Sequence, residues 1–583
     1  MRPPSRKIRV LTALALAIGP AVLLTGALHS PAAVAENNGV GLTPALGWSS
    51  WSFIRHDPTA AKIDAQADAM KNSGLAAAGF QYVNVDDFWY QCPGSQGPNV
   101  DAYGRWVTDT GKFPASGATD GIQVVADHVH ADRLKFGLYV TPGISSQAVA
   151  KNTPILGTSY HADDIATTAA EKNYNCHGMV GIDYTKPGAQ AFINSWADEF
   201  ASWGVDYVKI DGVGTGDIPD IKAWSAALKQ TGRPIHLELS NNLSISAAST
   251  WQQYSNGWRT GGDIECYGCE SGGSSYPLTD WSQVQSRFAQ VANWQPYGGP
   301  GAFNDYDSTE VGNGSNDGLT APERQSMMSL WAMGASPLIL GTDLTNLDPT
   351  DLSYLKNSAV LAVDQDSIDA ARIVNSGNQQ VYSKTESDGS VVIGLFNYSA
   401  TSSQTDTVSL SAAGIHSATT ATDLWTGRSL GTISGSYSVN LGPGAVQLIK
   451  TAPGAGSAGI RIEAEASGNT IAGAARIASC SACSGGEKVG YIGNGSANYV
   501  TVNGVDESKA GTYTLTFAYL VSGTRTFDIS VDGGPDIVET LSGTSFSTPV
   551  NASIPVTLNA GANTIKFHND TAYGPDLDVI TVS

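Results

Sequence analysis

Two aspartates end short apolar segments, and each has a cation close by in the sequence. Asp211 lies two residues after Lys209, and Asp263 lies four residues after Arg259. In barrel folds, the ionisable groups that do chemistry stand at the C-terminal ends of strands. A pair of acids is the machinery for cleaving a glycosidic bond, so the sequence predicts glycoside hydrolysis at this pair.

Short β-like segments alternate with amphipathic ones from Pro44 to about Asp366. The candidate strands are Ala45–Trp51, Tyr82–Asp87, Phe136–Thr141, Tyr207–Asp211, Ile235–Ser240, Gly257–Asp263, Ala302–Asp305 and Leu338–Gly341. The candidate helices between them include Ala60–Ala77, Ile122–Asp132 and Gly188–Trp203. This alternation predicts a (β/α)8 TIM barrel. An open doubly wound sheet is the alternative, but no G-x-G-x-x-G motif opens a helix after a strand.

After Asp366 the pattern changes to short strands with polar turns. We predict that the barrel spans residues 36–368 and that an antiparallel β-sandwich domain spans 369–452. A Pro/Gly/Ser/Ala linker follows over 453–459. Regular short strands over 460–583 predict a second β-sandwich, of jelly-roll type.

The N-terminus resembles a secretory signal, predicted over residues 1–35. A basic start precedes an apolar stretch from Val10 to Leu28, and Ala33–Ala35 offers an A-x-A cleavage site. A retained membrane anchor is the alternative; Pro20 counts against it, and no other apolar run is long enough to span a bilayer. We therefore expect a secreted, extracellular protein that is not held in a membrane.

The net charge of −21 argues against a nucleic-acid partner, because a phosphate backbone attracts a basic surface. It suits a protein that meets neutral ligands such as carbohydrates. The sequence gives no indication of the oligomeric state.

Six cysteines in an exported chain favour disulfides, although the sequence allows many connectivities. The simplest pairing is Cys92–Cys176, Cys266–Cys269 and Cys480–Cys483. The two C-x-x-C units are an alternative zinc site, but they lie far apart, in regions of different character.

Five clusters fall at the predicted C-terminal ends of strands and would converge on one face of the barrel. They are Trp48/Trp51, Asp86-Asp87, Lys209/Asp211, Arg259/Asp263 and Asp305/Asp307. Carboxylates accept hydrogen bonds from sugar hydroxyls, and tryptophan covers the C–H faces of a sugar ring. A loop from about Ser145 to Gly181 is predicted as an insertion over one edge of this site.

Some of these residues also have a structural interpretation. Asp87 and Asp307 could be helix N-caps, and Trp48 could be a core residue. Asp305 and Asp307 have no nearby His or Glu that would complete a metal site, so we expect no cofactor for catalysis.

Six segments occur in an order that resembles one enzyme family. They are Leu46–Trp51, Tyr82–Asp87, Tyr207–Gly212, Trp258–Ile264, Gly299–Asp307 and Trp331–Leu338. Together they resemble glycoside hydrolase family 27, the α-galactosidase or melibiase family, from about Leu42 to Asp366 and onward to Lys450.

The resemblance implies a retaining double displacement. By motif position Asp211 is the nucleophile, kept ionised with help from Lys209, and Asp263 is the acid/base, which must be protonated to release the leaving group. The residues at positions that hold the sugar are Trp51, Asp86, Asp87, Tyr139, Lys209 and Arg259.

The sequence departs from the family in two places. Val213 stands where family α-galactosidases usually carry a cysteine, and the fifth-strand loop reads Glu238–Asn242 in place of the usual motif that selects the group on C2. Asp86 and Asp87 favour an α-galactosidase. The alternatives are a β-L-arabinopyranosidase, whose sugar is galactose lacking C6, or an enzyme releasing isomaltose from dextran. A non-catalytic sugar-binding protein is a further alternative, which the presence of both acids disfavours.

The C-terminal unit resembles carbohydrate-binding modules of family 35 or 6, and a tethered module implies a polysaccharide substrate. Glu463, Glu465 and Asp578 are candidate ligands of a structural calcium ion. Exposed acids on an edge strand are the alternative interpretation. Tyr491 and Asn569 are candidate sugar contacts.

Overall fold

The computed structural model describes residues 36–270, 274–415, 418–453, 455, 460–507 and 510–582. The predicted signal segment and most of the predicted linker lie outside the described residues. Within these ranges, none of the helices has the length and apolar character needed to span a bilayer.

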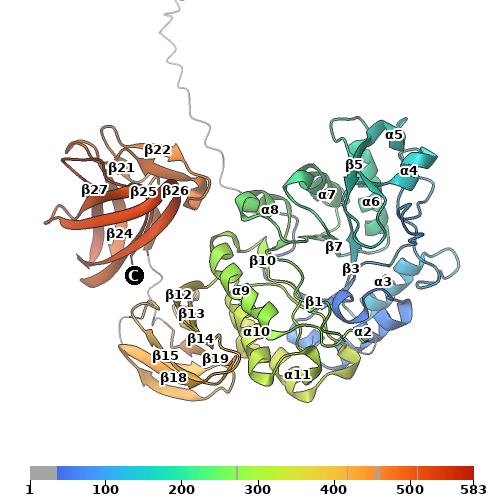
Figure 1. The fold of residues 1–583 in the computed structure, drawn as a ribbon, viewed down its shortest axis with the longest axis horizontal. Helices are drawn as coiled ribbons and strands as arrows, with labels where there is room; N and C mark the ends of the chain where they lie inside the picture. Colours follow the sequence, from blue (N-terminus) through green and yellow to red (C-terminus); the bar gives the residue numbers. More distant parts are fainter. Residues whose placement is uncertain are drawn as a thin grey trace, which may run out of the picture. The chain divides into compact units, whose positions relative to one another are not determined.

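In the described part of the chain, eight parallel strands form one curled sheet (Figure 1). They are β1 Leu46–Ser49, β2 Tyr82–Val85, β3 Lys135–Val140, β7 Tyr207–Ile210, β8 His236–Leu239, β9 Gly257–Arg259, β10 Phe303–Asp305 and β11 Leu338–Leu340. Their order is β10-β9-β8-β7-β3-β2-β1-β11. A parallel bridge between Thr309, just after β10, and Leu340 brings the ends of the sheet together. The predicted (β/α)8 barrel is confirmed, and the open sheet is wrong.

Helices surround the sheet (Figure 1). They are α1 Trp51–Ile54, α2 Ala60–Asn72, α3 Gly121–Ala131, α6 Ala189–Ser202, α7 Ile218–Gln230, α8 Ala248–Tyr254, α9 Trp281–Trp294, α10 Ala321–Met333, α11 Pro349–Leu355 and α12 Ser358–Gln365. The helix predicted over Ala60–Ala77 ends early because Gly74 adopts a left-handed conformation, with φ 85°. A short 3₁₀ turn, Ala76–Ala78, follows.

The predicted insertion between β3 and α6 has secondary structure of its own. Its elements are β4 Ile144–Ser145, α4 Ser146–Lys151, α5 Ala162–Ile165, β5 Ala166–Glu171 and β6 Met179–Ile182. The strands pair antiparallel in the order β4-β6-β5. The segment predicted as a loop is therefore a small folded subdomain.

A second, antiparallel domain follows the barrel. Its strands are β12 Ala371–Ser376, β13 Gln379–Thr385, β14 Val391–Asn397, β15 Gln404–Ser409, β16 Thr419–Asp423, β17 Ser429–Ile433, β18 Ser436–Leu441 and β19 Val446–Thr451. Six of them form the sheet β12-β13-β14-β19-β16-β17, and β15 pairs with β18. Alternation along β14 explains how this sheet packs: Ile393 and Leu395 join the domain's own core, whereas Val392 and Phe396 join the core of the barrel.

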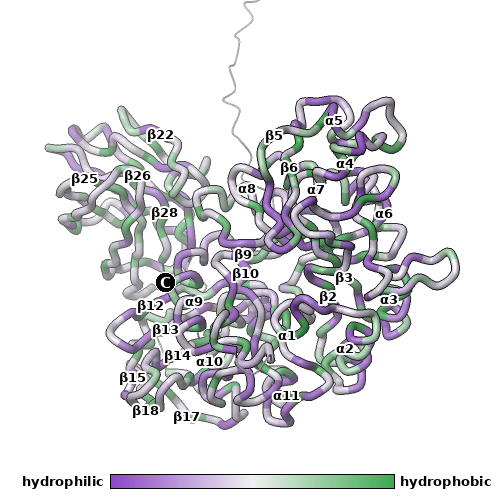
Figure 2. The backbone as a smooth tube through the Cα atoms, turned by 45° about the vertical axis from the view of Figure 1, so that its right-hand side comes forward, coloured by the Kyte–Doolittle hydropathy of each residue, from purple (hydrophilic) through white to green (hydrophobic). Residues whose placement is uncertain are grey.

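The C-terminal unit is a separate antiparallel β-structure with its own apolar core. Its strands are β20 Ile460–Glu463, β21 Thr470–Ile471, β22 Arg476–Ser479, β23 Glu487–Gly490, β24 Val500–Glu507, β25 Gly511–Val531, β26 Ile537–Leu558, β27 Gly561–His568 and β28 Asp576–Val582. Figure 2 shows the hydropathy along these strands. The class of antiparallel β-sandwich is confirmed for both domains after the barrel, while the boundaries between units stay predictions.

A buried lysine joins the barrel to the second domain. The side chain of Lys384, on β13, is only 1% exposed, and its Nζ donates to Asp366 Oδ1 at 2.7 Å and to the Ile368 carbonyl at 2.9 Å. It also donates to the carbonyl of Val363, in α12. Because a buried ammonium needs partners for all its protons, this contact fixes the end of the barrel against β13.

We expect Lys384→Met to destabilise the full chain by about 3–5 kcal/mol, because it leaves the Asp366 carboxylate and two carbonyls without their donor. Urea unfolding of the whole protein measures this change. Lys62→Met is the matched control, since it breaks a surface pair with Asp57 in which the two side chains are 46% and 68% exposed, and it should cost less than about 1 kcal/mol. Equal losses in the two variants would contradict the role given to Lys384.

Candidate active site

A pocket of about 200 Å³ lies at the C-terminal ends of the barrel strands. All eight residues predicted from the sequence line it: Trp51, Asp86, Asp87, Tyr139, Lys209, Asp211, Arg259 and Asp263. Among the described residues, four others line it: Tyr174, Asn175 and Tyr267, which were not predicted, and Asn241, which belongs to the Glu238–Asn242 loop noted in the sequence. Tyr174 and Asn175 come from the insertion, Asn241 follows β8 and Tyr267 follows β9.

Parallel pairing sets the depth of each side chain in the barrel. Lys209 on β7 lies level with Tyr139 on β3 and with Glu238 on β8. The backbone N–H of Asp211 donates to the Val140 carbonyl, which continues the ladder past the end of β7. Because strand residues two apart share a side, Lys209 and Asp211 both face the interior, with Asp211 nearer the mouth.

The Asp211 carboxylate is oriented by three donors. Its Oδ1 accepts from the Ser240 hydroxyl and the Gly212 N–H, both at 2.9 Å, and its Oδ2 accepts from the Tyr139 hydroxyl at 3.2 Å. Burial raises the pKa of Asp211 even though the Lys209 ammonium opposes the change. Fixed orientation and partial compensation of charge suit a carboxylate that must attack one defined atom.

Lys209 forms its ion pair with Asp86, with Nζ 2.8 Å from Asp86 Oδ2. Although burial disfavours the ammonium, the charges of Asp86 and Asp211 outweigh it and raise the pKa of Lys209. The charge of Lys209 therefore favours the ionised form of Asp211, as expected, while its hydrogen-bonded partner is Asp86.

Asp87 is almost fully buried at the edge of the pocket beyond β2. Its Oδ1 accepts from the Tyr90 hydroxyl and the Phe88 N–H, and its Oδ2 accepts from Asn175 Nδ2, all at 2.7 Å. Burial raises the pKa of Asp87 to about 6, although these donors oppose the rise. None of the described helices begins at Asp87, so the alternative interpretation as an N-cap is wrong.

Arg259 bridges two carboxylates with one nitrogen. Its Nη2 lies 2.8 Å from Asp263 Oδ1 and 2.9 Å from Asp307 Oδ2. Asp307 also accepts from the Ile264 N–H at 2.7 Å, so it holds the loop after β9 and caps no helix. Asp263, Glu265 and Asp307 offer oxygens within 4.8 Å of one another, and Arg259 supplies the positive charge that such a group requires.

Tyr267 is the second donor to Asp263. Its hydroxyl donates to Asp263 Oδ2 at 2.7 Å and accepts from Trp51 Nε1 at 2.7 Å. Burial favours a higher pKa for Asp263, but Arg259 and the Tyr267 hydroxyl outweigh it and lower the pKa to about 2. The pKa of Asp211 is thus raised and that of Asp263 lowered. The first step of a double displacement requires the opposite, an ionised Asp211 and a protonated Asp263.

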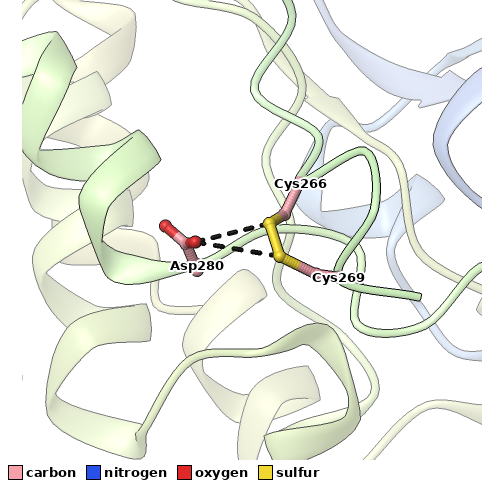
Figure 3. Close-up of side chains that lie close together, drawn as sticks. All are labelled: Cys266, Cys269 and Asp280. Carbon is pink, nitrogen blue, oxygen red and sulfur yellow. Dashed lines mark hydrogen bonds between the residues drawn. A yellow bond between two sulfur atoms is a disulfide. The ribbon is translucent and has the colours of Figure 1, made fainter. Parts of the chain in front are cut away.

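The loop that carries Tyr267 is closed by the disulfide between Cys266 and Cys269, beside Asp280 (Figure 3). The guanidinium of Arg55 lies over the Tyr267 ring at 4.8 Å. The structure also contains disulfides Cys92–Cys176 and Cys480–Cys483, so the simplest pairing of the sequence is the one observed. Because both C-x-x-C units are oxidised, the zinc interpretation is wrong.

Glu238 and Asp305 lie below the pocket, lining a smaller polar cavity of about 40 Å³ inside the barrel. Glu238 Oε2 lies 2.9 Å from His236 Nε2. Burial raises the pKa of each of these two acids to about 8. Glu238 therefore does not line the sugar-sized pocket. Trp48 is fully buried and lines neither cavity, which fits its interpretation as a core residue.

The two predicted sugar contacts of the C-terminal unit have different surroundings. Tyr491 is 48% exposed, and the Arg476 guanidinium lies 3.7 Å from its ring centroid. Asn569 is only 6% exposed; its Oδ1 accepts from the Ala572 N–H and its Nδ2 donates to the Thr526 carbonyl. The amide of Asn569 is therefore used to hold its own loop, which does not support a role in sugar contact.

Comparison with known families matches three models in order along the chain. Residues 43–232 match Melibiase, residues 173–366 match Alpha galactosidase A, and residues 376–451 match the Alpha galactosidase C-terminal beta sandwich domain.

Curated relatives include the alpha-galactosidase of Cyamopsis tetragonoloba, 31% identical over 71% of this chain and 88% of that one. Alpha-galactosidase A of Cellvibrio japonicus is 32% identical over 61% of this chain and 76% of that one. Among solved structures, the GH27 β-L-arabinopyranosidase of Geobacillus stearothermophilus aligns with TM-score 0.64 and 31% identity, over 71% of this chain and 98% of that one. Alpha-galactosidase I of Mortierella vinacea aligns with TM-score 0.56 and 26% identity, over 72% of this chain and all of that one.

A (β/α)8 barrel with paired carboxylates in a polar pocket, followed by a β-sandwich domain, is the architecture of a glycosidase. The chain belongs to the melibiase family, glycoside hydrolase family 27.

Proposed function

We propose that this protein is a secreted, retaining α-galactosidase that releases terminal α-linked galactose from oligo- or polysaccharides. The observation that carries the proposal is the pocket itself: Asp211 and Asp263 face it together, and Asp86 and Asp87 line it as well. Galactose is supported by the names of the curated relatives.

In the first step, an oxygen of Asp211 attacks the anomeric carbon while Asp263 gives its proton to the departing glycosidic oxygen. Ser240, Gly212 and Tyr139 hold the attacking carboxylate in place. A covalent glycosyl ester on Asp211 results, and the alcohol leaves.

In the second step, water takes the place of the leaving group. Asp263, now ionised, removes a proton from the water as it attacks the anomeric carbon. The ester to Asp211 breaks, and the sugar leaves with its original anomeric configuration. Retention requires the two carboxyl groups to lie about 5–5.5 Å apart.

The surroundings of Asp263 favour its second role over its first. Arg259 and Tyr267 both donate to its carboxylate, which stabilises the base form. The acid form is therefore the minor one at rest, and the reaction must work against these two donors in its first step. Tyr267 is the partner that a leaving group entering from the mouth of the pocket can displace, because Tyr267 is half exposed.

A β-L-arabinopyranosidase is the second candidate. The observation that favours it is the Geobacillus stearothermophilus neighbour, which bears that name and aligns at 31% identity. The mechanism would be unchanged, because the two sugars differ only at C6.

Secretion is supported by the signal-like N-terminus and by three disulfides among the described cysteines. We propose that the C-terminal unit is a carbohydrate-binding module that holds the enzyme near a polysaccharide. Exposed Tyr491 and Tyr573, whose ring centroids lie 6.4 Å apart, support a sugar-stacking surface there.

The unpartnered oxygens of three acids in this unit support the proposal of a structural calcium ion. Glu463 Oε2, Glu465 Oε2 and Asp578 Oδ1 are buried and have no hydrogen-bond donor. Burial raises the pKa of Glu465 and of Asp578 to about 7, and a divalent cation would remove this penalty. Among the described residues, the oxygens of these three acids do not all lie within 4.8 Å of one another. Binding of an ion would therefore draw them closer together.

Replacement of either catalytic acid tests the function. We expect Asp211→Ala to lower kcat/KM on 4-nitrophenyl α-D-galactopyranoside at least about a thousandfold, because no nucleophile remains. With azide, Asp211→Ala should yield the β-galactosyl azide and Asp263→Ala the α-galactosyl azide, since only the first variant lacks the covalent step. Asp127→Ala, on the exposed face of α3, is the control. A wild-type protein inactive on galactosides, or Asp211→Ala as active as wild type, would disprove the proposal.

The Tyr267 hydroxyl should control the pH range of the reaction. It stabilises ionised Asp263, so Tyr267→Phe raises the pKa of Asp263 and keeps the acid protonated to higher pH. We expect the alkaline limb of the kcat/KM profile to move upward by about one pH unit. Tyr174→Phe, in the same pocket but without a bond to Asp263, should leave that limb in place. An unmoved limb in Tyr267→Phe would contradict this role.

Calcium should stabilise the C-terminal unit of the full-length protein. We expect 1 mM CaCl₂, added after EDTA treatment, to raise its unfolding transition in calorimetry by several degrees, since binding to the folded state shifts unfolding by mass action. Asp578→Asn should abolish the response. Equal transitions with calcium and with EDTA would show that no such site exists.

A further inference from the structure

The insertion Ile144–Ile182 sends one short segment into the pocket. Cys176, at the end of this segment, is tied to Cys92 by a disulfide. Asn173 is buried; its Nδ2 donates to the Tyr90 hydroxyl at 3.0 Å, and its Oδ1 accepts from the Cys176 N–H at 2.8 Å. The segment is therefore held in place on both sides of Asn175.

Asn175 has hydrogen-bonding capacity to spare inside the pocket. One proton of its Nδ2 goes to Asp87 Oδ2 at 2.7 Å. Among the hydrogen bonds of the described residues, none uses its Oδ1 or its second amide proton. Asp87, by contrast, already accepts from three donors, and a carboxylate has about four lone-pair positions. A sugar hydroxyl that reaches this end of the pocket meets Asn175 as well as Asp87.

The barrel fixes which part of the sugar reaches Asp87. Asp87 follows β2 and Asp263 follows β9, and these strands are four places apart in the eight-stranded order, on opposite sides of a closed barrel. If the anomeric carbon lies at Asp211 and Asp263, the opposite ring atom, C4, and the substituents beside it point to Asp87. The longest of these substituents is the hydroxymethyl group on C5.

We propose that Asn175 is a specificity-determining residue, which binds the C6 hydroxyl of the substrate together with Asp87. Asn175 stands on the insertion, outside the ring of residues that follow the strands. It can therefore contact the C6 hydroxyl, which the hydroxymethyl group carries away from the sugar ring. The free carbonyl oxygen of the Asn175 amide can accept a hydrogen bond from the C6 hydroxyl, and its free N–H can donate one to the hydroxyl oxygen. This inference rests on the proposed function, because it assumes a galactose-like sugar bound at Asp211 and Asp263.

A pair of substrates that differ only at C6 tests the proposal. 4-Nitrophenyl α-D-galactopyranoside carries the hydroxymethyl group, and 4-nitrophenyl β-L-arabinopyranoside lacks it. We expect Asn175→Ala to lower kcat/KM about tenfold on the galactoside, the loss of about 1.4 kcal/mol that a hydrogen bond to a buried group can supply. On the arabinopyranoside the change should stay within about twofold. The ratio of the two kcat/KM values is measured on one preparation of each variant, so a loss of folded protein lowers both values equally and leaves the ratio unchanged.

Asn241→Ala is the matched control, because Asn241 lines the same pocket next to Ser240, which bonds the nucleophile. Because Ser240 bonds the nucleophile, Asn241 stands on the side of the pocket that would receive C1, which the two sugars share, so Asn241→Ala should lower both activities alike. Equal losses on both substrates in Asn175→Ala, or a rise in the galactoside ratio, would overturn the proposal. A wild-type protein that cleaves neither glycoside would instead disprove the proposed function, and the inference with it.

Discussion

The acids at the mouth of the barrel can be buried together because two cations lie among them. Lys209 compensates Asp86, and Arg259 compensates Asp263 and Asp307. Without these cations, desolvation and mutual repulsion would push the carboxyls towards their neutral forms. The positions of both cations follow from strand geometry, since each stands on a strand at a level set by parallel pairing.

This arrangement distributes charge unevenly between the two acids. Asp211 is buried among neutral donors, with its nearest cation bonded to Asp86. Asp263 accepts directly from a guanidinium and a tyrosine. The same contacts that orient Asp263 therefore make it a better base than acid. The bound leaving group must raise the pKa of Asp263, so that the carboxyl carries a proton when the first step begins. A hydrogen bond to a half-exposed tyrosine is easier to exchange for a substrate contact than one to buried Arg259.

The barrel and eight of its pocket residues could be predicted because these residues stand on strands or within a few residues of a strand's end, where periodicity and motif order determine their positions. The pocket residues that were missed stand on loops. Asn175 and Tyr174 lie in an insertion whose path is set by a disulfide and by Asn173, neither of which has a periodic signal. Tyr267 lies inside a C-x-x-C unit, and that small loop next to Asp263 was the available clue.

Two predicted residues have hydrogen-bond partners that the sequence did not indicate. Lys209 was placed on the correct face of β7 and its charge acts on Asp211 as predicted, but side-chain reach, which spacing does not determine, gives it Asp86 as its bonded partner. Asn569 was chosen as a polar residue near a loop end, and in the structure its amide holds that loop. Spacing predicts which side of an element a residue occupies, whereas its hydrogen-bond partners depend on the chain packed against it.

The central claim is that Asp211 forms a covalent bond to the sugar. Its most direct test is inactivation of the full-length protein with 5-fluoro-α-D-galactosyl fluoride, followed by mass spectrometry of the digested protein. We predict one glycosyl group, carried by the peptide that contains Asp211, and none on the Asp211→Ala variant. A label on a different residue, or turnover of galactosides with inversion and no covalent species, would contradict the account.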